Sequence, residues 1–217
     1  MLAVPATGPE GPRLTRRPTT SVLLAAALAL LAPVGAHAGE PRQHDGGFFL
    51  RLALGGGYAR TALDELDERL TFKGPSANFD IAIGGMVKKN FAVHATLGGW
   101  GLPEPTVQVG SFEDTADDTT MTVSMIGGGF TYYLGPSNVY LTASVGAAIL
   151  SIDFDGDRED SDTGVAFEVG LGKEWWVGNR WGLGLSGTAG HHSVPSGDTP
   201  SHFKGPSFAV RFSATFN

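Results

Sequence analysis

Apolar residues alternate with small or polar residues along much of this chain, and the pattern is clearest between Gly164 and Gly190. Apolar side chains occupy every second position on both sides of Gly178-Asn179-Arg180, at Val165, Phe167, Val169, Leu171, Trp181, Leu183 and Leu185. The intervening positions are mostly Gly, Ser, Thr or Glu. A period of two on either side of a short turn predicts a β-hairpin with one apolar face and one face of small or charged residues.

The same alternation predicts eight strands, near residues 48–55, 78–87, 91–100, 121–134, 139–149, 164–176, 181–190 and 208–216. Long polar connections at 61–76, 101–119, 153–162 and 191–204 follow the odd-numbered strands. Short turns follow the second, fourth and sixth strands, and each contains an Asn (Asn90, Asn138, Asn179). The fourth strand holds three consecutive Gly residues at 127–129, which are compatible with a bulge, so its two faces stay unassigned. Strict alternation of long and short connections predicts an all-β, eight-stranded antiparallel up-and-down barrel.

Aromatic residues gather at the short-turn ends of the predicted strands. The predicted girdle consists of Phe48, Phe91, Tyr133, Trp175, Trp181 and Phe216. An aromatic rim beside an apolar band is typical of the interface between a membrane and water. The pattern therefore predicts a transmembrane barrel.

The direction of the apolar face decides between a membrane barrel and a soluble one. A lipocalin-like barrel would turn this face inward and expose the other face to water. That other face is rich in Gly, Ala, Ser and Thr, whereas water-facing surfaces usually carry many Lys, Glu and Gln. In a membrane barrel, the opposite facing would also put Arg51 and Arg211 against lipid, at about 2–4 kcal/mol each near the midplane. We therefore expect the apolar face to point outward, with a lipocalin-like barrel as the alternative.

The first 38 residues have the features of a cleaved export signal. Three Arg residues precede an apolar run from Ser21 to Leu31, and Ala36-His37-Ala38 matches a signal-peptidase site. We expect residues 39–46 to be a periplasmic lead-in and residues 47–217 to be the barrel domain. The chain has no Cys, so no disulfide contributes to its stability, and its formal net charge of −7 argues against a nucleic-acid partner.

Signal, strand number, loop alternation and aromatic rim together resemble the small eight-stranded outer-membrane β-barrels of Gram-negative bacteria, of the OmpA-like and OmpX-like kind. The resemblance covers the whole chain after residue 38 and rests on architecture, without a single diagnostic motif. It implies a location in the outer membrane of a Gram-negative bacterium. It also implies contact with outer-membrane lipid and lipopolysaccharide, and insertion by the barrel assembly machinery.

The alternation places six ionisable residues on the inward face: Arg51, Asp80, His94, Glu168, Glu174 and Arg211. Closure of the barrel makes the first and last strands neighbours, so Arg51 and Arg211 are expected on adjacent walls with Asp80 nearby. Buried charges must be paired, which predicts an ion-pair network that fills the lumen. A narrow, gated small-solute channel is the alternative, because paired charges can exchange partners.

Acidic residues dominate the long connections, and the segment from Asp153 to Asp162 carries six of them. Its Gly156 and Gly164 do not fit the positions that an EF-hand requires, so we predict no metal site, no cofactor and a solvated acidic loop. Loose binding of divalent cations near lipopolysaccharide phosphates is the alternative. His191 and Ser193 resemble the His-x-Ser pair of outer-membrane lipid A deacylases, but no Glu follows them to orient the His, and Asp198 is the sole substitute. We expect a non-enzymatic barrel with acidic extracellular loops that serves envelope structure or surface interaction. Its extracellular partner is not evident from the sequence, and a lipid A-modifying hydrolase is the alternative.

Overall fold

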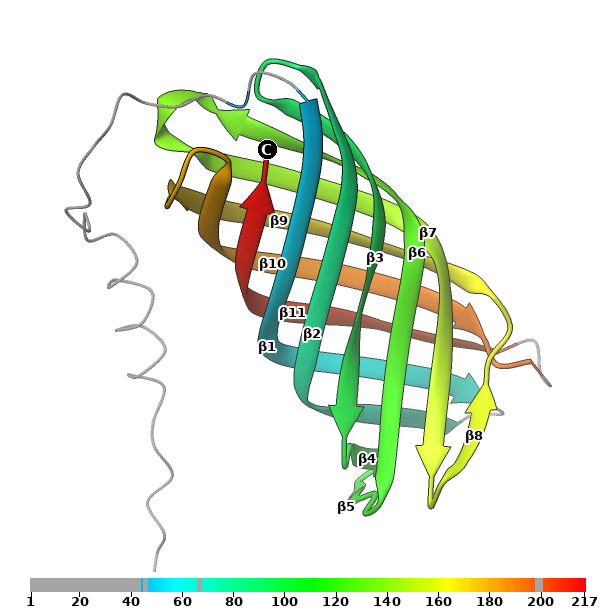
Figure 1. Ribbon diagram of the computed structural model, residues 1–217. Coiled ribbons are helices and arrows are strands. Elements are labelled where there is room, and N and C mark those ends of the chain that lie inside the picture. Colours follow the sequence, from blue (N-terminus) through cyan, green and yellow to red (C-terminus); the bar gives the residue numbers. More distant parts are fainter. Residues whose placement is uncertain (1–43, 45–46, 66–67, 198–200) are drawn as a thin grey trace, which may run out of the picture. The chain divides into compact units, whose positions relative to one another are not determined.

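Long antiparallel strands that follow one another around a cylinder form the barrel (Figure 1). The computed structural model describes residue 44 and residues 47–65, 68–197 and 201–217. Within these ranges, eight long strands build the wall: β1 (Gly47–Glu65), β2 (Glu68–Lys88), β3 (Phe91–Pro103), β6 (Thr119–Leu134), β7 (Val139–Phe154), β9 (Gly164–Trp176), β10 (Trp181–Pro195) and β11 (His202–Phe216). β1 pairs with both β2 and β11, so the sheet closes on itself. The predicted eight-stranded up-and-down barrel is confirmed.

All four connections that we expected to be long loops are mostly strand. Residues 61–76 continue β1 and β2, which pair from Gly47↔Met86 as far as Glu65↔Glu68. The segment 153–162 forms the end of β7 and the short strand β8 (Asp157–Asp160), and much of 191–204 belongs to β10 and β11. Within 101–119, β4 (Thr106–Val109) and β5 (Phe112–Thr115) form a small hairpin against β2. Apolar side chains of these segments, such as Leu63, Leu102 and Phe203, are buried in the cluster at this end of the barrel, and cross-strand pairing joins the segments to one another.

The fourth predicted strand, β6, has regular faces and contains no bulge. Its register with β3 and β7 is continuous through Gly127, Gly128 and Gly129. Gly127 lies opposite Gly146 of β7, and a Cβ added to either residue would overlap the backbone of the other strand. The glycines therefore permit close approach of two strands. A register shift occurs instead in β2, between Met86 and Lys88.

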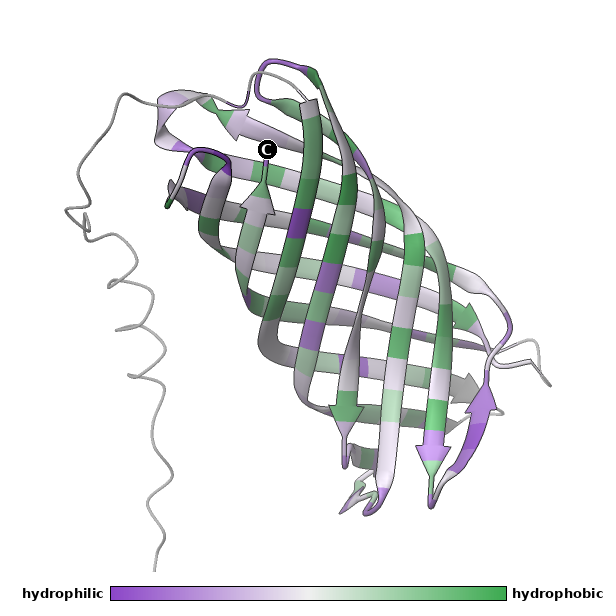
Figure 2. Ribbon diagram, viewed as in Figure 1, coloured by the Kyte–Doolittle hydropathy of each residue, from purple (hydrophilic) through white to green (hydrophobic). Residues whose placement is uncertain are grey.

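Apolar side chains point away from the lumen on every long strand. On β1, Leu52 and Leu54 are exposed whereas Phe49, Arg51 and Ala53 are buried. Figure 2 shows the resulting alternation of hydrophobic and polar positions along the strands. The barrel surface carries large exposed apolar residues on all walls, such as Ile126, Val145, Phe167 and Phe212. No helix within the described residues is long and apolar enough to cross a membrane.

The interior has three layers along the barrel axis. A small cluster lies at the short-turn end and contains Phe49, Ala82, Ala92, Tyr133 and Tyr140. A larger apolar cluster fills the opposite, hairpin end and includes Trp100, Leu102, Met121, Leu150, Val194 and Phe203. The ionisable residues lie between and beside these clusters, so the lumen is packed like a protein core. The expected signal, most of the lead-in and Asp198 lie outside the described residues.

Candidate functional site

The six inward-facing ionisable residues all lie in the lumen. Arg51, Asp80, His94, Glu174 and Arg211 are at most 7% exposed, and Glu168 is partly buried. The sequence interpretation treated them as one network. The structure divides them into three groups at different heights.

The first group is a bidentate ion pair between β11 and β9. Arg211 donates from Nη1 and Nη2 to the two carboxylate oxygens of Glu168, at 2.6 Å each. Two parallel charge-assisted bonds fix the guanidinium plane as well as its position. The Nε atom of Arg211 is buried without a hydrogen-bond partner among the described residues. This pair therefore joins β11 to β9 on the inner side of the intervening strand β10.

The second group surrounds Arg51. Its Nη2 lies 3.8 Å from the carboxylate of Asp80, and the guanidinium donates to the hydroxyls of Thr131 at 3.2 Å and Thr142 at 3.1 Å. His94 continues this group through hydrogen bonds to Thr131 and Thr96. The charge of Arg51 is thus dispersed over a carboxylate and two threonine hydroxyls. Thr131 and Thr142 were absent from the predicted set, although both lie at inward positions of their strands.

The third group lies at the short-turn end and centres on Glu174. Its carboxylate accepts hydrogen bonds from Thr215 at 2.6 Å and from the Tyr133 hydroxyl at 3.2 Å. The His44 ring stacks on Tyr133 with centroids 3.5 Å apart, and its Nε2 lies 3.9 Å from Glu174. His44 belongs to the predicted lead-in, and the sequence offered no periodicity to place it. Its backbone carbonyl accepts a bond from the Asn90 amide at 2.7 Å, so the chain entering β1 caps this end of the lumen.

The prediction is wrong for one residue of the aromatic girdle. Tyr133 is fully buried in the lumen, and its neighbour Tyr132 faces outward. Because the faces of β6 were unassigned, the sequence could not distinguish the two tyrosines. The remaining predicted aromatics lie at the short-turn end, where Phe216 contacts Phe48 and Trp181, and Phe91 contacts Tyr132 and Phe130. Trp175 lies beside Lys173, whose ammonium is 5.7 Å from the ring centroid.

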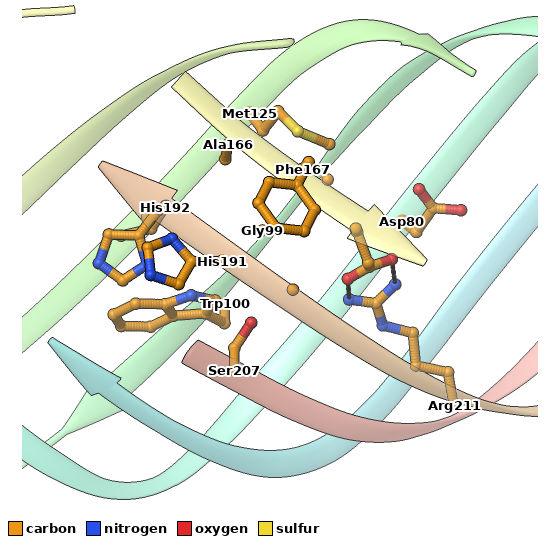
Figure 3. A pocket seen from close by; sticks show the side chains of 14 residues that line it. Asp80, Gly99, Trp100, Met125, Ala166, Phe167, His191, His192, Ser207 and Arg211 are labelled. Atoms are coloured by element: carbon orange, nitrogen blue, oxygen red, sulfur yellow. Dashed lines mark hydrogen bonds and ion pairs between the residues drawn. The ribbon is translucent and has the colours of Figure 1, made fainter. Parts of the chain in front are cut away.

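Two small cavities flank the Arg211–Glu168 pair. The first has a volume of about 30 Å³ and lies toward the hairpin end, where Trp100, Met125 and His192 line it (Figure 3). The second has a volume of about 10 Å³ and lies toward Arg51 and His94. Volumes of this size hold one or two water molecules. These two spaces beside the Arg211–Glu168 pair are therefore water-sized.

His191 and Ser193 do not form the expected pair. The His191 ring is exposed and stacks on Phe167 with centroids 5.9 Å apart, while the hydroxyl of Ser193 lies 3.4 Å from Nδ1 of His202. His192 points into the lumen and bonds to Thr61 at 2.9 Å. Within the described residues, no carboxylate forms a hydrogen bond or ion pair with His191, Ser193 or His202. In the part of the chain that the structure describes, no carboxylate orients these histidines as a catalytic histidine requires, and Asp198 lies outside that part.

The acidic connections are held mainly by backbone pairing. In the β7–β8 hairpin, Arg158 donates to Asp160 at 3.0 Å and to the Ser151 hydroxyl at 2.8 Å. Hydrogen bonds from Ser151 and Arg158 lower the pKa of Asp160 below its ordinary value of 3.8. Among the residues that the structure describes, no group of three His, Asp or Glu side chains could hold a metal ion.

A closed barrel with an apolar exterior and buried ion pairs defines a membrane-spanning β-barrel. The family model described as "Outer membrane protein beta-barrel domain" matches residues 23–216, and the chain belongs to this family. Its location is therefore the outer membrane.

Several solved structures are similar to the chain at low identity. Neisserial surface protein A has 15% identity, with 77% of this chain and 97% of that chain covered and a TM-score of 0.49. Ail of Yersinia pestis has 13% identity, 77% and 99% coverage and a TM-score of 0.45. OprG of Pseudomonas aeruginosa has 12% identity, 82% and 100% coverage and a TM-score of 0.43. No curated protein sequence matches the chain.

Proposed function

We propose that this protein is a non-enzymatic scaffold of the Gram-negative outer membrane, with a filled lumen and acidic loops on the cell surface. The observation that supports the proposal is the presence of packed side chains at both ends and in the middle of the lumen. His44, Tyr133 and Glu174 occupy the short-turn end, two ion-pair groups lie in the middle, and apolar side chains occupy the hairpin end. Such an interior stabilises a barrel and leaves its loops for recognition.

Orientation follows from the connections. The short turns face the periplasm, as in other outer-membrane barrels, and the β1–β2, β4–β5 and β7–β8 hairpins extend outside the cell. The β4–β5 tip presents Glu113 and Asp114, and the β7–β8 hairpin presents Asp153, Asp155 and Asp157. Acidic, exposed hairpins suit envelope structure or contact with a surface partner. Outer-membrane lipid, lipopolysaccharide and the barrel assembly machinery are the further partners that this function requires.

Electrophoresis of the outer-membrane fraction tests the scaffold. Unboiled protein should migrate differently from boiled protein, because a closed barrel resists detergent until it is heated. A soluble periplasmic protein with no mobility shift would support the lipocalin-like alternative and refute the proposal.

The narrow-channel alternative is tested in planar bilayers. The purified barrel should give no discrete conductance steps, because only water-sized cavities flank the Arg211–Glu168 pair. Regular steps that disappear on boiling the sample would establish a channel instead.

The hydrolase alternative is tested by mass spectrometry of lipid A from cells with and without the protein. We expect identical spectra, because the Ser193 hydroxyl lies beside His202 and, among the described residues, no carboxylate contacts this pair. Loss of one acyl chain that depends on Ser193 and on either His191 or His202 would show an enzyme.

A further inference from the structure

The outward surface of β11, β1 and β2 carries a group of basic residues just above the apolar band. Arg60 of β1 pairs in register with Lys73 of β2, and Ala62, two residues after Arg60, pairs with Lys204 of β11. All three positions have outward parity, and Arg60 and Lys204 are exposed. Directly opposed side chains are about 5 Å apart at Cβ and diagonal ones about 7–8 Å. We call Arg60, Lys73 and Lys204 the basic ladder.

The height of the basic ladder follows from the strand geometry. The outward face of β1 runs from Phe48, in the short-turn girdle, through Leu52 and Leu54 to Tyr58. Ten residues at about 3.3 Å each, tilted by about 40° from the axis, span about 25 Å. This length matches the height of the apolar band of outer-membrane barrels, about 25 Å. Arg60 is the next outward position and therefore lies at the headgroup level of the outer leaflet.

Aromatic residues mark the same boundary. Tyr58 pairs with Phe208 of β11 and with Pro75 of β2, and both rings are about half exposed on the barrel surface. Tyr and Phe at this position anchor the barrel at the interface, with the basic ladder immediately beyond them. Apolar, aromatic and cationic residues thus follow one another in the order of the acyl chains, glycerol or sugar region and phosphates of a lipid.

Only one of the three cations of the basic ladder is paired with an acidic side chain among the described residues. Lys73 forms an ion pair with Glu113 at 2.8 Å and a hydrogen bond with Gln108 at 3.0 Å. The side chains of Arg60 and Lys204 form no hydrogen bond or ion pair with the residues that the structure describes. Two exposed cations in a chain with net charge −7, both on one wall and both at the lipid interface, are available for an external anion. Arg binds phosphate in a bidentate manner, and Lys adds a point charge from a flexible stem that reaches along the surface.

We infer that the basic ladder binds the phosphorylated headgroup of one outer-leaflet glycolipid, of the lipid A type, with Arg60 and Lys204 as the main contacts. This inference rests on the proposed location and orientation in the outer membrane. The acyl chains would lie along Leu54, Tyr58 and Phe208. The site would give the barrel a preferred lipid on one wall, whereas the β6–β7 wall offers no equivalent cations at its hairpin end apart from Arg158, which is paired with Asp160.

Native mass spectrometry of the full barrel in detergent tests the site, with bisphosphorylated lipid A as the probe. The wild-type protein should bind one lipid A molecule at low excess. The R60Q/K204Q variant should bind at least about tenfold more weakly, because charged hydrogen bonds contribute about one to two factors of ten each. The R158Q variant removes one positive charge from another wall and should bind like the wild type.

Two further probes separate the sources of binding. Lipid A from which both phosphates have been removed should bind the wild-type protein as weakly as R60Q/K204Q binds the intact lipid. Inorganic phosphate at 100-fold excess should not displace lipid A, because it lacks the acyl chains that contact the apolar band. Equal binding of the dephosphorylated lipid, displacement by inorganic phosphate, or an equal loss in R158Q would each overturn the inference.

The mobility shift on boiling, measured for each variant, distinguishes failure of the lipid site from failure of the proposed scaffold function. If R60Q/K204Q retains the mobility shift and still binds lipid A normally, the scaffold stands and the lipid site fails. If the wild-type protein shows no shift at all, the scaffold itself fails. Should R60Q/K204Q not fold, the single variants R60Q and K204Q serve instead. Each should bind lipid A about tenfold more weakly than the wild type, and wild-type binding by both would overturn the inference.

Discussion

Removal of Arg211 tests whether ion pairs in the lumen hold the barrel together. In the R211M variant, the carboxylate of Glu168 loses two charge-assisted bonds of 2.6 Å and stays in the lumen without its partner. Each hydrogen bond to a charged group contributes about 1.5–3 kcal/mol, and breaking a buried pair from one side costs about 3–5 kcal/mol. With an m value of about 2–3 kcal/mol per M urea, the unfolding midpoint should fall by about 1–2.5 M.

The assay is equilibrium unfolding in urea of the barrel in phospholipid vesicles, followed by tryptophan fluorescence and by the gel shift. The R211M/E168M double variant should lose less than R211M, because apolar side chains replace both charges and no unpaired charge remains. The R180M variant serves as the control, since Arg180 is exposed in a turn and its loss should cost less than about 1 kcal/mol. A loss below about 1 kcal/mol in R211M, or a double variant that equals the sum of both single variants, would refute the reasoning.

Three further outcomes are expected. L183R should impair membrane assembly far more than S186R, because Leu183 faces lipid and Ser186 faces the lumen beside Arg211; equal yields of heat-modifiable barrel would contradict this facing. G146A should lower the unfolding midpoint measurably, because its Cβ meets the backbone around Gly127, and an unchanged midpoint would show that β6 and β7 can separate there. The contact between Asp160 and Arg158 should stabilise the β7–β8 hairpin above pH 3.8, and this contribution should disappear as the pH falls through the lowered pKa of Asp160. An NMR titration in which the Asp160 carboxyl has its midpoint above pH 3.8 would contradict this.

The sequence predicted the facing of strands wherever large apolar residues alternate with small ones. Phe48 and Phe49 were separated correctly because Leu50, Leu52 and Leu54 continue the outward series. Tyr132 and Tyr133 were not separated, because Gly127–Gly129 carry no side chain to mark a face. Beyond the membrane-facing band, the alternation of apolar and small residues no longer indicates which way a strand faces. Thr61, Ala62 and Leu63 are consecutive and all buried, so they show no period of two.

The lumen illustrates a second limit. Alternation identified which charged residues point inward, but it gave no heights along the barrel. Glu168 and Glu174 share one face of β9, yet six residues separate them by about 20 Å. The first therefore meets Arg211, and the second meets Tyr133, Thr215 and His44. Partners of this kind depend on strand stagger and on hydroxyl groups, neither of which hydrophobic periodicity reveals.

Closure between β1 and β11 has a consequence for biogenesis. The seam joins Leu50–Leu63 to Phe203–Phe216, the two ends of the chain, so no partial chain can complete the sheet. Arg211 and Thr215 also come from β11, and the ion pair with Glu168 and the bond to Glu174 cannot form before this strand arrives. Until then the edges of β1 and β10 are unpaired, and the carboxylates of Glu168 and Glu174 lack their partners from β11. Unpaired strand edges readily pair with other chains. Closure of the barrel and pairing of the Glu168 and Glu174 carboxylates therefore both depend on the addition of β11 between β10 and β1.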